Sequence, residues 1–160
     1  MDQKPGPQRI GVIVSPKPKL NEPALRSMVL AMNKEQDLLQ FEFYDADFCD
    51  PLMAMVGGGR KPVDRDQLRE MLPDFVRDLR QDLSSRCSDY KLSENVPARY
   101  IVISQCRFGD NYYSARRGPC SVLALGNWRR YMAPPSLLEF VQVLLVREAV
   151  AILCPSLKDL

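Results

Sequence analysis

The stretch Val143–Leu153 reads VLLVREAVAIL and sets a glutamate, Glu148, beside an arginine, Arg147, inside an otherwise apolar run. A positioned glutamate can act as a general base. At about 100° per residue, a helical wheel places Glu148 on the apolar side of the helix and Arg147 on its polar side. The sequence therefore predicts that the Glu148 carboxylate is paired, is protonated or lines a cavity.

The chain contains no histidine among its 160 residues. Imidazole is the base in Ser-His-Asp and Cys-His nucleophile pairs and a frequent ligand of zinc and iron. The composition excludes those chemistries and leaves carboxylate, lysine or tyrosine chemistry open. A carboxylate-dependent hydrolase or nucleotide-processing enzyme would bring Glu148 together with Asp110 and an arginine in one pocket. These two carboxylates are the candidate catalytic residues.

A polar loop over residues 107–119 mixes arginines with tyrosines. The net charge of the chain is only +2, but residues 99–130 hold six arginines against Asp110 alone. Tyr, Trp and Arg are enriched at protein interfaces, and the same mixture can stack bases and hold phosphates. We expect a surface that contacts another protein, with nucleic-acid binding as an alternative. The candidate binding residues are Arg107, Tyr112, Tyr113, Arg116, Arg117, Trp128, Arg129 and Arg130.

Other patterns point away from metals, cofactors and membranes. The five cysteines are odd in number and lack C-x-x-C spacing, which is typical of reduced thiols in a cytoplasmic protein. Asp45, Asp47 and Asp50 lack the spacing of a calcium loop, and VGGGRKP lacks the phosphate-loop pattern. The amino terminus has no signal-type apolar core, and no uncharged apolar run is long enough to cross a bilayer. We expect no metal, no cofactor and no membrane partner.

Hydrophobic periodicity predicts the strands that would position these residues. Residues 9–16 form a β-branched apolar run and residues 39–46 alternate apolar with polar, so both predict strands. A helical pattern over residues 23–36 lies between them, and strand, helix and strand in close succession are typical of a βαβ unit. Residues 98–106 predict a buried third strand, and residues 120–128 a shorter fourth one.

The other helices follow from caps and apolar stripes. Asp64 can cap a long amphipathic helix, in which Pro73 predicts either a kink or a division into two helices. Ser136 and Glu139 form an S-x-x-E capping box that begins the final helix. Residues 49–63, which are rich in glycine and proline, are expected to form a loop.

The order of elements is β-α-β-α-β-β-α, which is typical of an α/β fold. We expect a mixed, mostly parallel sheet of about four strands covered by helices. A chain of 160 residues is the size of one ordinary domain. Residues 1–8 are therefore predicted to be a flexible tail, and residues 9–160 a single α/β domain.

The segment REAVA, residues 147–151, has the spacing of the H-E-x-x-H motif of zincin metalloproteases, with its glutamate at Glu148. Arg147 and Ala151 occupy the two histidine positions. Upstream, YIVISQCRFGDNYYSARRGPCSVLALGNW is similar to the strand, aspartate-bearing loop and edge strand that precede the active helix in archaemetzincin-like zincins. Residues 99–153 thus resemble a degenerate zincin. The resemblance implies the family's fold without its zinc, because arginine repels a cation and alanine provides no ligand.

The leading hypothesis is a non-catalytic protein-interaction or regulatory module. The resemblance implies a degenerate metalloprotease-like domain, a pseudoenzyme. From the overall character of the sequence we expect this domain to be part of a larger bacterial protein or complex. The carboxylate enzyme and the nucleic-acid binder stay open as alternatives. The surroundings of Glu148 discriminate between the non-catalytic module and the carboxylate enzyme, because a catalytic carboxylate faces a solvent-filled cleft whereas a structural one is sealed against an arginine.

Overall fold

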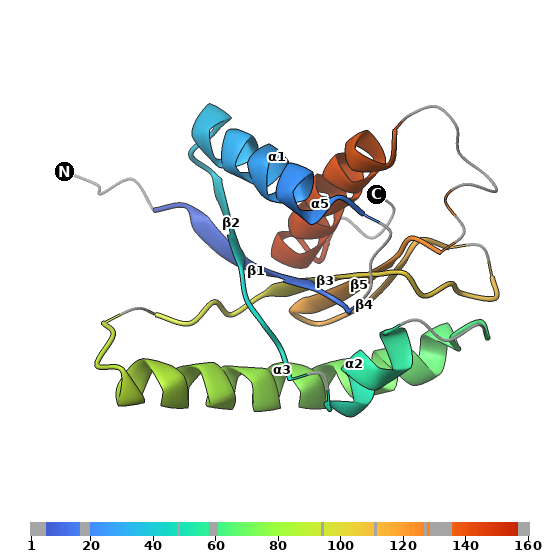
Figure 1. The fold of residues 1–160 in the computed structure, drawn as a ribbon, viewed down its shortest axis with the longest axis horizontal. Helices are drawn as coiled ribbons and strands as arrows, with labels where there is room; N and C mark the ends of the chain where they lie inside the picture. Colours follow the sequence, from blue (N-terminus) through green and yellow to red (C-terminus); the bar gives the residue numbers. More distant parts are fainter. Residues whose placement is uncertain are drawn as a thin grey trace.

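One β-sheet separates two layers of helices (Figure 1). The structure, a computed structural model, describes residues 6–16, 20–47, 49–57, 61–93, 95–110, 112–126, 128 and 136–156. Residues 1–5 of the predicted tail lie outside these ranges, whereas Gln8 already belongs to the first strand. In the described parts of the chain, no helix is both long and apolar enough to cross a membrane.

The sheet confirms the predicted α/β class with a mixed, mostly parallel arrangement. Its strands are β1 (Gln8–Val14), β2 (Leu39–Phe43), β3 (Tyr100–Ser104), β4 (Ser114–Arg117) and β5 (Cys120–Ala124). Their order in space is β2-β1-β3-β5-β4, and every pair is parallel except β4 with β5. The described sheet thus has five strands, one more than the sequence predicted.

The additional strand is β4, within residues 107–119, which were predicted to be a loop. Its four residues read SARR, and only Ala115 is apolar and buried, so no alternating pattern marks it. A tight turn brings β4 back onto β5, and Gly118 in that turn has a φ of +56°, a conformation that favours glycine. The neighbouring strand and the turn, rather than its own residues, make this segment a strand.

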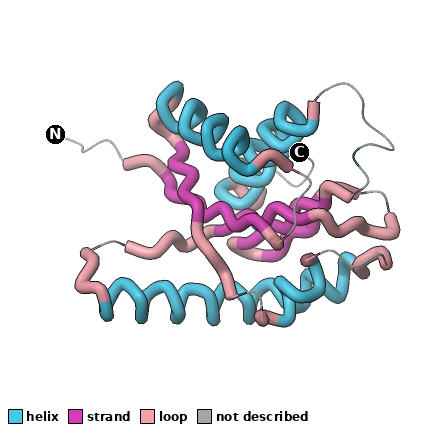
Figure 2. Tube along the Cα trace, viewed as in Figure 1, coloured by secondary structure: helices cyan, strands magenta, loops and turns pink. Residues whose placement is uncertain are grey.

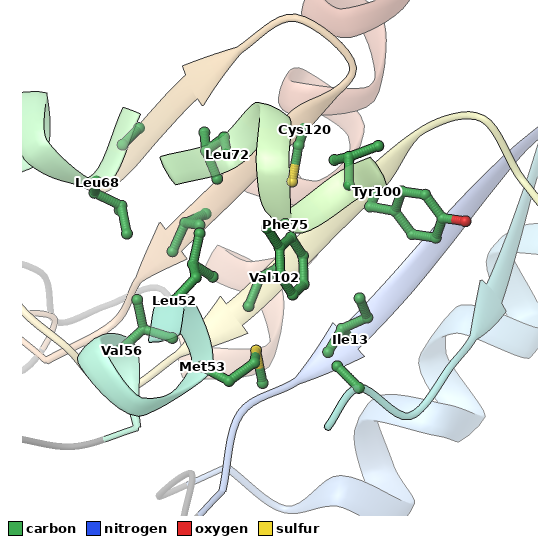
Figure 3. Packing of buried hydrophobic residues seen from close by; sticks show 14 of the residues in the cluster. Ile13, Leu52, Met53, Val56, Leu68, Leu72, Phe75, Tyr100, Val102 and Cys120 are labelled. Atoms are coloured by element: carbon green, nitrogen blue, oxygen red, sulfur yellow. The ribbon is translucent and has the colours of Figure 1, made fainter. Parts of the chain in front are cut away.

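The two faces of the sheet carry different helices (Figures 1 and 2). Helices α1 (Glu22–Glu35) and α5 (Leu137–Leu153) cover one face, and α2 (Pro51–Val56) and α3 (Arg65–Asp89) cover the other. Figure 3 shows the core under α2 and α3, where Leu52, Phe75 and Val102 pack together. Each face thus has its own apolar core, and a side chain belongs to one or the other according to its parity along the strand.

Helix α2 lies in the segment predicted as a loop, so that prediction was wrong for six residues. The carboxylate of Asp50 caps the helix by accepting a hydrogen bond from the amide of Leu52 at 2.7 Å, and Pro51 is its first residue. Leu52 and Val56 are buried against the sheet. A helix this short shows less than two turns of periodicity, which is why its apolar residues did not reveal it.

Helix α3 runs through Pro73 as a single element of 25 residues. Of the two predicted alternatives, the division into two helices is therefore wrong. A proline inside a helix costs about 3 kcal/mol because it removes one backbone hydrogen bond. Leu72, Phe75 and Val76 on either side of it are buried against the sheet, and this burial offsets the loss.

Helix α5 begins as predicted. The Ser136 hydroxyl accepts a hydrogen bond from the Glu139 amide at 3.3 Å, and the Glu139 carboxylate accepts one from the Ser136 amide at 2.8 Å. The reciprocal pair is a complete capping box. The Ser136 hydroxyl also donates to the Glu139 carboxylate at 2.6 Å, and this bond, together with the one from the Ser136 amide, lowers the pKa of Glu139. The cap sets the residue at which the helix begins, and the apolar stripe of the helix determines which of its faces meets the sheet.

An ion pair joins β1 to β2 near the edge of the sheet. Arg9 donates from Nε and Nη2 to the two carboxylate oxygens of Glu42, at 2.8 and 2.6 Å, and the Tyr44 hydroxyl donates to the same carboxylate at 2.8 Å. Burial by itself raises the pKa of Glu42. The hydrogen bonds from Arg9 and Tyr44 and the charge of Arg9 together outweigh burial and lower this pKa.

The lowered pKa predicts how stability depends on pH. A carboxylate whose pKa is depressed by folding stabilises the fold above its unfolded pKa, and this contribution is lost as the pH falls through the folded value. The wild type should therefore lose more unfolding free energy than Glu42→Gln when the pH drops from 7 to about 3. Urea unfolding at both pH values measures the difference. Arg9→Gln should show the same shallow dependence, and a Glu42→Gln variant as pH-sensitive as the wild type would contradict the assignment.

Candidate functional site

The side chain of Glu148 projects from helix α5 toward strands β4 and β5. The side chain of Glu148 is 0% exposed, as the helical wheel predicted for the apolar side. Its Oε2 atom accepts hydrogen bonds from Arg116 Nη1 at 3.0 Å and from Ser121 Oγ at 2.8 Å. Arg116 and Ser121 are register partners across β4 and β5, so both project toward α5 from the same face of the sheet.

A second arginine approaches the same carboxylate from its own helix. Arg147 Nη2 lies 3.3 Å from Glu148 Oε1 and donates a hydrogen bond to Ser114 Oγ at 3.2 Å. The side chain of Arg147 is 40% exposed, so it covers the carboxylate from the rim of the helix. Of the three predicted states for Glu148, the structure shows the paired one, sealed against two arginines.

This arrangement is suited to holding α5 on the sheet rather than to proton transfer. A general base must come within hydrogen-bond reach of its substrate, about 3 Å or one water away. Glu148 has no exposed surface, and Arg116 and Ser121 already occupy Oε2. Removing either arginine would leave a buried charge with fewer partners, which is a cost in stability. The contacts therefore make Glu148 an anchor between the last helix and the edge of the sheet.

The second candidate carboxylate, Asp110, lies elsewhere. Its Oδ2 atom is 2.8 Å from Arg65 Nε at the start of α3, and the Arg65 guanidinium stacks 3.9 Å from the centre of the Tyr112 ring. Helix α3 covers the opposite face of the sheet from α5, which carries Glu148. The described structure does not bring the two carboxylates together, and each has an arginine of its own.

Four of the candidate binding residues lie beyond the carboxyl ends of the parallel strands: Arg107, Tyr112, Tyr113 and Trp128. Arg107 and Tyr112 are exposed there, and Tyr113 is half-buried, with its ring edge-on to Phe140 at 4.8 Å between ring centres. Trp128 is also half-buried and lines a pocket of about 400 Å³ near the starts of α1 and α5. Arg107 and Tyr112 are the described members of this group that a partner could reach most fully.

The remaining candidates do not join that group. Because Arg117 pairs with Cys120 at the amino end of β5, the two arginines of β4 lie toward the other end of the sheet. Arg117 is exposed, whereas Arg116 is engaged by Glu148. Arg129 and Arg130 lie outside the described residues. The predicted surface is thus divided, and substituting Arg116 would test the anchor of α5 rather than a binding surface.

An apolar groove of about 800 Å³ lies between the carboxyl-terminal halves of α1 and α5. Its floor is formed by the start of β2 and its walls by the two helices. The lining residues are Gln8, Met28, Ala31, Met32, Glu35, Gln36, Leu38, Leu39, Phe41, Gln142, Val146, Val150, Leu153 and Cys154. The volume falls in the range of ligand and peptide sites.

Large apolar side chains remain in contact with water in this groove. Leu38 is 69% exposed and Val146 is 40% exposed, and Met28 and Met32 are half-buried beside them. Contiguous exposed apolar surface marks interaction sites, and methionine side chains adapt to the shape of a partner. Sequence reasoning missed this groove. The available signal was that Val143 and Val146 fall within the polar stripe of the α5 wheel.

Beside the groove, the outer edge of β2 is closed by two amide side chains, that of Asn33 in α1 and that of Gln36, the C-cap of α1. Gln36 donates to the Leu39 carbonyl at 2.6 Å and accepts from the Leu39 amide at 2.7 Å. Asn33 makes the same two contacts with Phe41, at 2.8 and 3.0 Å. These backbone groups would otherwise be available to another strand.

The cysteines are free thiols, and within the described residues no three acidic or thiol side chains gather as a metal site would require. Burial raises the pKa of Cys106 to about 11 and that of Cys120 to about 12, so both stay protonated. Cys154, at the end of α5, and Cys49 are exposed. The exposed thiol of Cys154 lines the groove and offers a native reporter there.

No known protein informs the interpretation of the fold or of the groove. Comparison of the chain with known protein families, with curated proteins and with solved structures found no match.

Proposed function

We propose that this chain is a non-catalytic protein-interaction module, and that it binds its partner through the apolar groove between α1 and α5. The observation that carries the proposal is the exposure of Leu38 and Val146 in a continuous apolar hollow. Burying such side chains stabilises a complex by about 25 cal/mol for each Å² removed from water. A partner that fills the groove therefore removes the most apolar surface from water and forms the most stable complex.

The contacts of the candidate carboxylates support the same proposal. Glu148 is held by Arg116 and Ser121, and Asp110 by Arg65, so each serves the fold where it lies. On this proposal the zincin resemblance is one of architecture, with the helix retained and its chemistry lost. The five free thiols fit a reducing compartment, and we expect the module to act in the cytoplasm.

Site-specific photo-crosslinking tests the proposed function. A photoreactive residue at Val146 should give a discrete adduct with one partner in cells that produce the chain. Leu30 provides the matched control, because it is an equally apolar residue of α1 that is 60% exposed but does not line the groove. The partner is then identified by mass spectrometry, and the complex is re-formed from the purified proteins.

The groove must also be necessary for that complex. Met32→Lys places a charge in the groove wall and should abolish both the adduct and the purified complex, whereas Leu30→Lys should leave both intact. Circular dichroism shows whether the two variants are equally folded. Equal adducts from Val146 and Leu30, or a complex that tolerates Met32→Lys, would refute the groove as the binding surface.

A further inference from the structure

We propose that the occupant of the groove is an amphipathic helix of a partner protein, with an apolar stripe turned to the groove and a basic residue against Glu35. The inference rests on the proposed function and names its partner class. Four properties of the described residues carry it: the closed strand edge, the shape of the walls, the charge at the rim and the concavity of the surface.

The closed edge of β2 argues against a partner strand. A peptide that joins a sheet needs the outward backbone groups of the edge strand. At Leu39 and Phe41 these groups are already bonded to Gln36 and Asn33. A strand would have to displace four hydrogen bonds and gain no more than it broke. The groove therefore offers side-chain contacts rather than backbone pairing.

The walls fit a helix. The α5 residues that line the groove run from Gln142 to Leu153, which at 1.5 Å per residue gives a length on the order of 16 Å. A partner helix of about three turns has that length and presents apolar residues at i, i+3 or i+4, and i+7. The side chains of Met28 and Met32 in the opposite wall can adjust to such anchors.

The charge at the rim selects a basic partner. Among the described residues that line the groove, Glu35 is the one charged side chain. It is exposed and has no ion pair within the described residues. A lysine or arginine at the end of the apolar stripe of the partner would complement it, whereas a second glutamate there would be repelled.

The concave shape argues against a second copy of this chain. In a symmetric dimer the same patch meets itself. Two grooves placed face to face would leave both hollows unfilled and bring two copies of Glu35 to one interface. A convex helix from a different protein fills the hollow and avoids that repulsion.

A set of synthetic peptides of equal length tests the helix. The probe is a peptide of about 18 residues, long enough to form a helix, with leucines at i, i+3, i+4 and i+7 and flanking lysines. One control has the same residues scrambled so that no stripe forms, another alternates them as in a strand, and a third replaces the lysines with glutamates. Alkylation of the groove thiol, Cys154, reports occupancy, and Cys49 in the same molecule is the internal control.

The helical lysine peptide should slow Cys154 alkylation at least fivefold at saturation and leave Cys49 unchanged. The scrambled and alternating peptides should give no protection. Glu35→Lys should weaken the lysine peptide about two- to fivefold, the usual effect of an exposed ion pair, and strengthen the glutamate peptide. Glu22→Lys is the charge-matched control, because Glu22 lies on the same helix, pairs with Arg26 and does not line the groove.

Each of the other outcomes contradicts a helical partner and indicates a different occupant of the groove, or none. Equal protection by the alternating peptide would make the partner a strand. Protection of Cys154 that rises with protein concentration, together with a dimer in analytical ultracentrifugation, would make it a second copy. No protection by the helical peptide, with adducts still formed at Val146, would reject the helix and keep the interaction function. Loss of both results would reject the function as well.

Discussion

Arg116→Ala is expected to lower the free energy of unfolding by about 3 kcal/mol, because it leaves the buried carboxylate of Glu148 without its closest cation. The value is at the lower end of what breaking a buried ion pair costs, since Arg147 remains at 3.3 Å and Ser121 still donates. Urea unfolding followed by circular dichroism measures the change.

The neighbouring residue supplies a matched control. Arg117 is exposed on the same strand, and Arg117→Ala should change the unfolding free energy by no more than about 0.5 kcal/mol. Replacing both partners, as Arg116→Met with Glu148→Leu, should recover most of the lost stability, because apolar residues of similar volume often replace a buried ion pair without loss. Equal effects of the two alanine variants would show that Glu148 does not depend on Arg116.

Gly11→Ala is expected to destabilise the fold by about 2–3 kcal/mol, the cost of overpacking a core. A Cβ atom at Gly11 would lie 2.5 Å from Cδ1 and 2.7 Å from Cε1 of the Tyr100 ring. Tyr100 is completely buried, and its hydroxyl donates to the Pro97 carbonyl at 2.7 Å, so the ring has little freedom to withdraw. Calorimetry should show a fall in Tm, and Gly6→Ala, with nothing near its added Cβ, should not.

A second substitution distinguishes this clash from a general effect of alanine on β1. Tyr100→Leu removes the ring atoms that the new Cβ would meet, at a cost of its own. If the clash is the cause, Gly11→Ala costs less in the Tyr100→Leu background than in the wild type, and a double-mutant cycle measures this coupling. Purely additive effects would place the cost in the strand backbone instead.

The sequence predicted those elements whose own residues form a clear local pattern, such as an apolar run or a helix cap. The apolar run before Pro16 and the capping box at Ser136 are examples, and both predictions are confirmed. Helix α2 and strand β4 escaped because they have six and four residues and depend on neighbours for their apolar contacts. Short elements take their structure from tertiary packing, which a local pattern does not contain.

The candidate site also combines features that a local pattern predicts with features that depend on tertiary packing. The wheel predicted the burial of Glu148, because burial depends on the pattern of one helix. Its partner, Arg116, lies 32 residues away in the sequence and was assigned to a contact surface, since nothing in a local pattern pairs the two. The groove depends on the mutual arrangement of α1, α5 and β2, which no local pattern contains. The local signal was two valines, Val143 and Val146, on the polar side of α5, and both are exposed.

The amides that close the edge of β2 have a consequence for how the protein behaves at high concentration. An open edge strand next to an exposed apolar surface is a template on which unfolded chains can add and grow into fibres. The backbone N–H and C=O groups of Leu39 and Phe41 are already bonded to Asn33 and Gln36. The part of the edge beside the groove therefore lacks the free backbone groups on which another strand could add. Asn33 and Gln36 thus occupy the backbone positions of β2 at which another strand would add beside the exposed apolar groove.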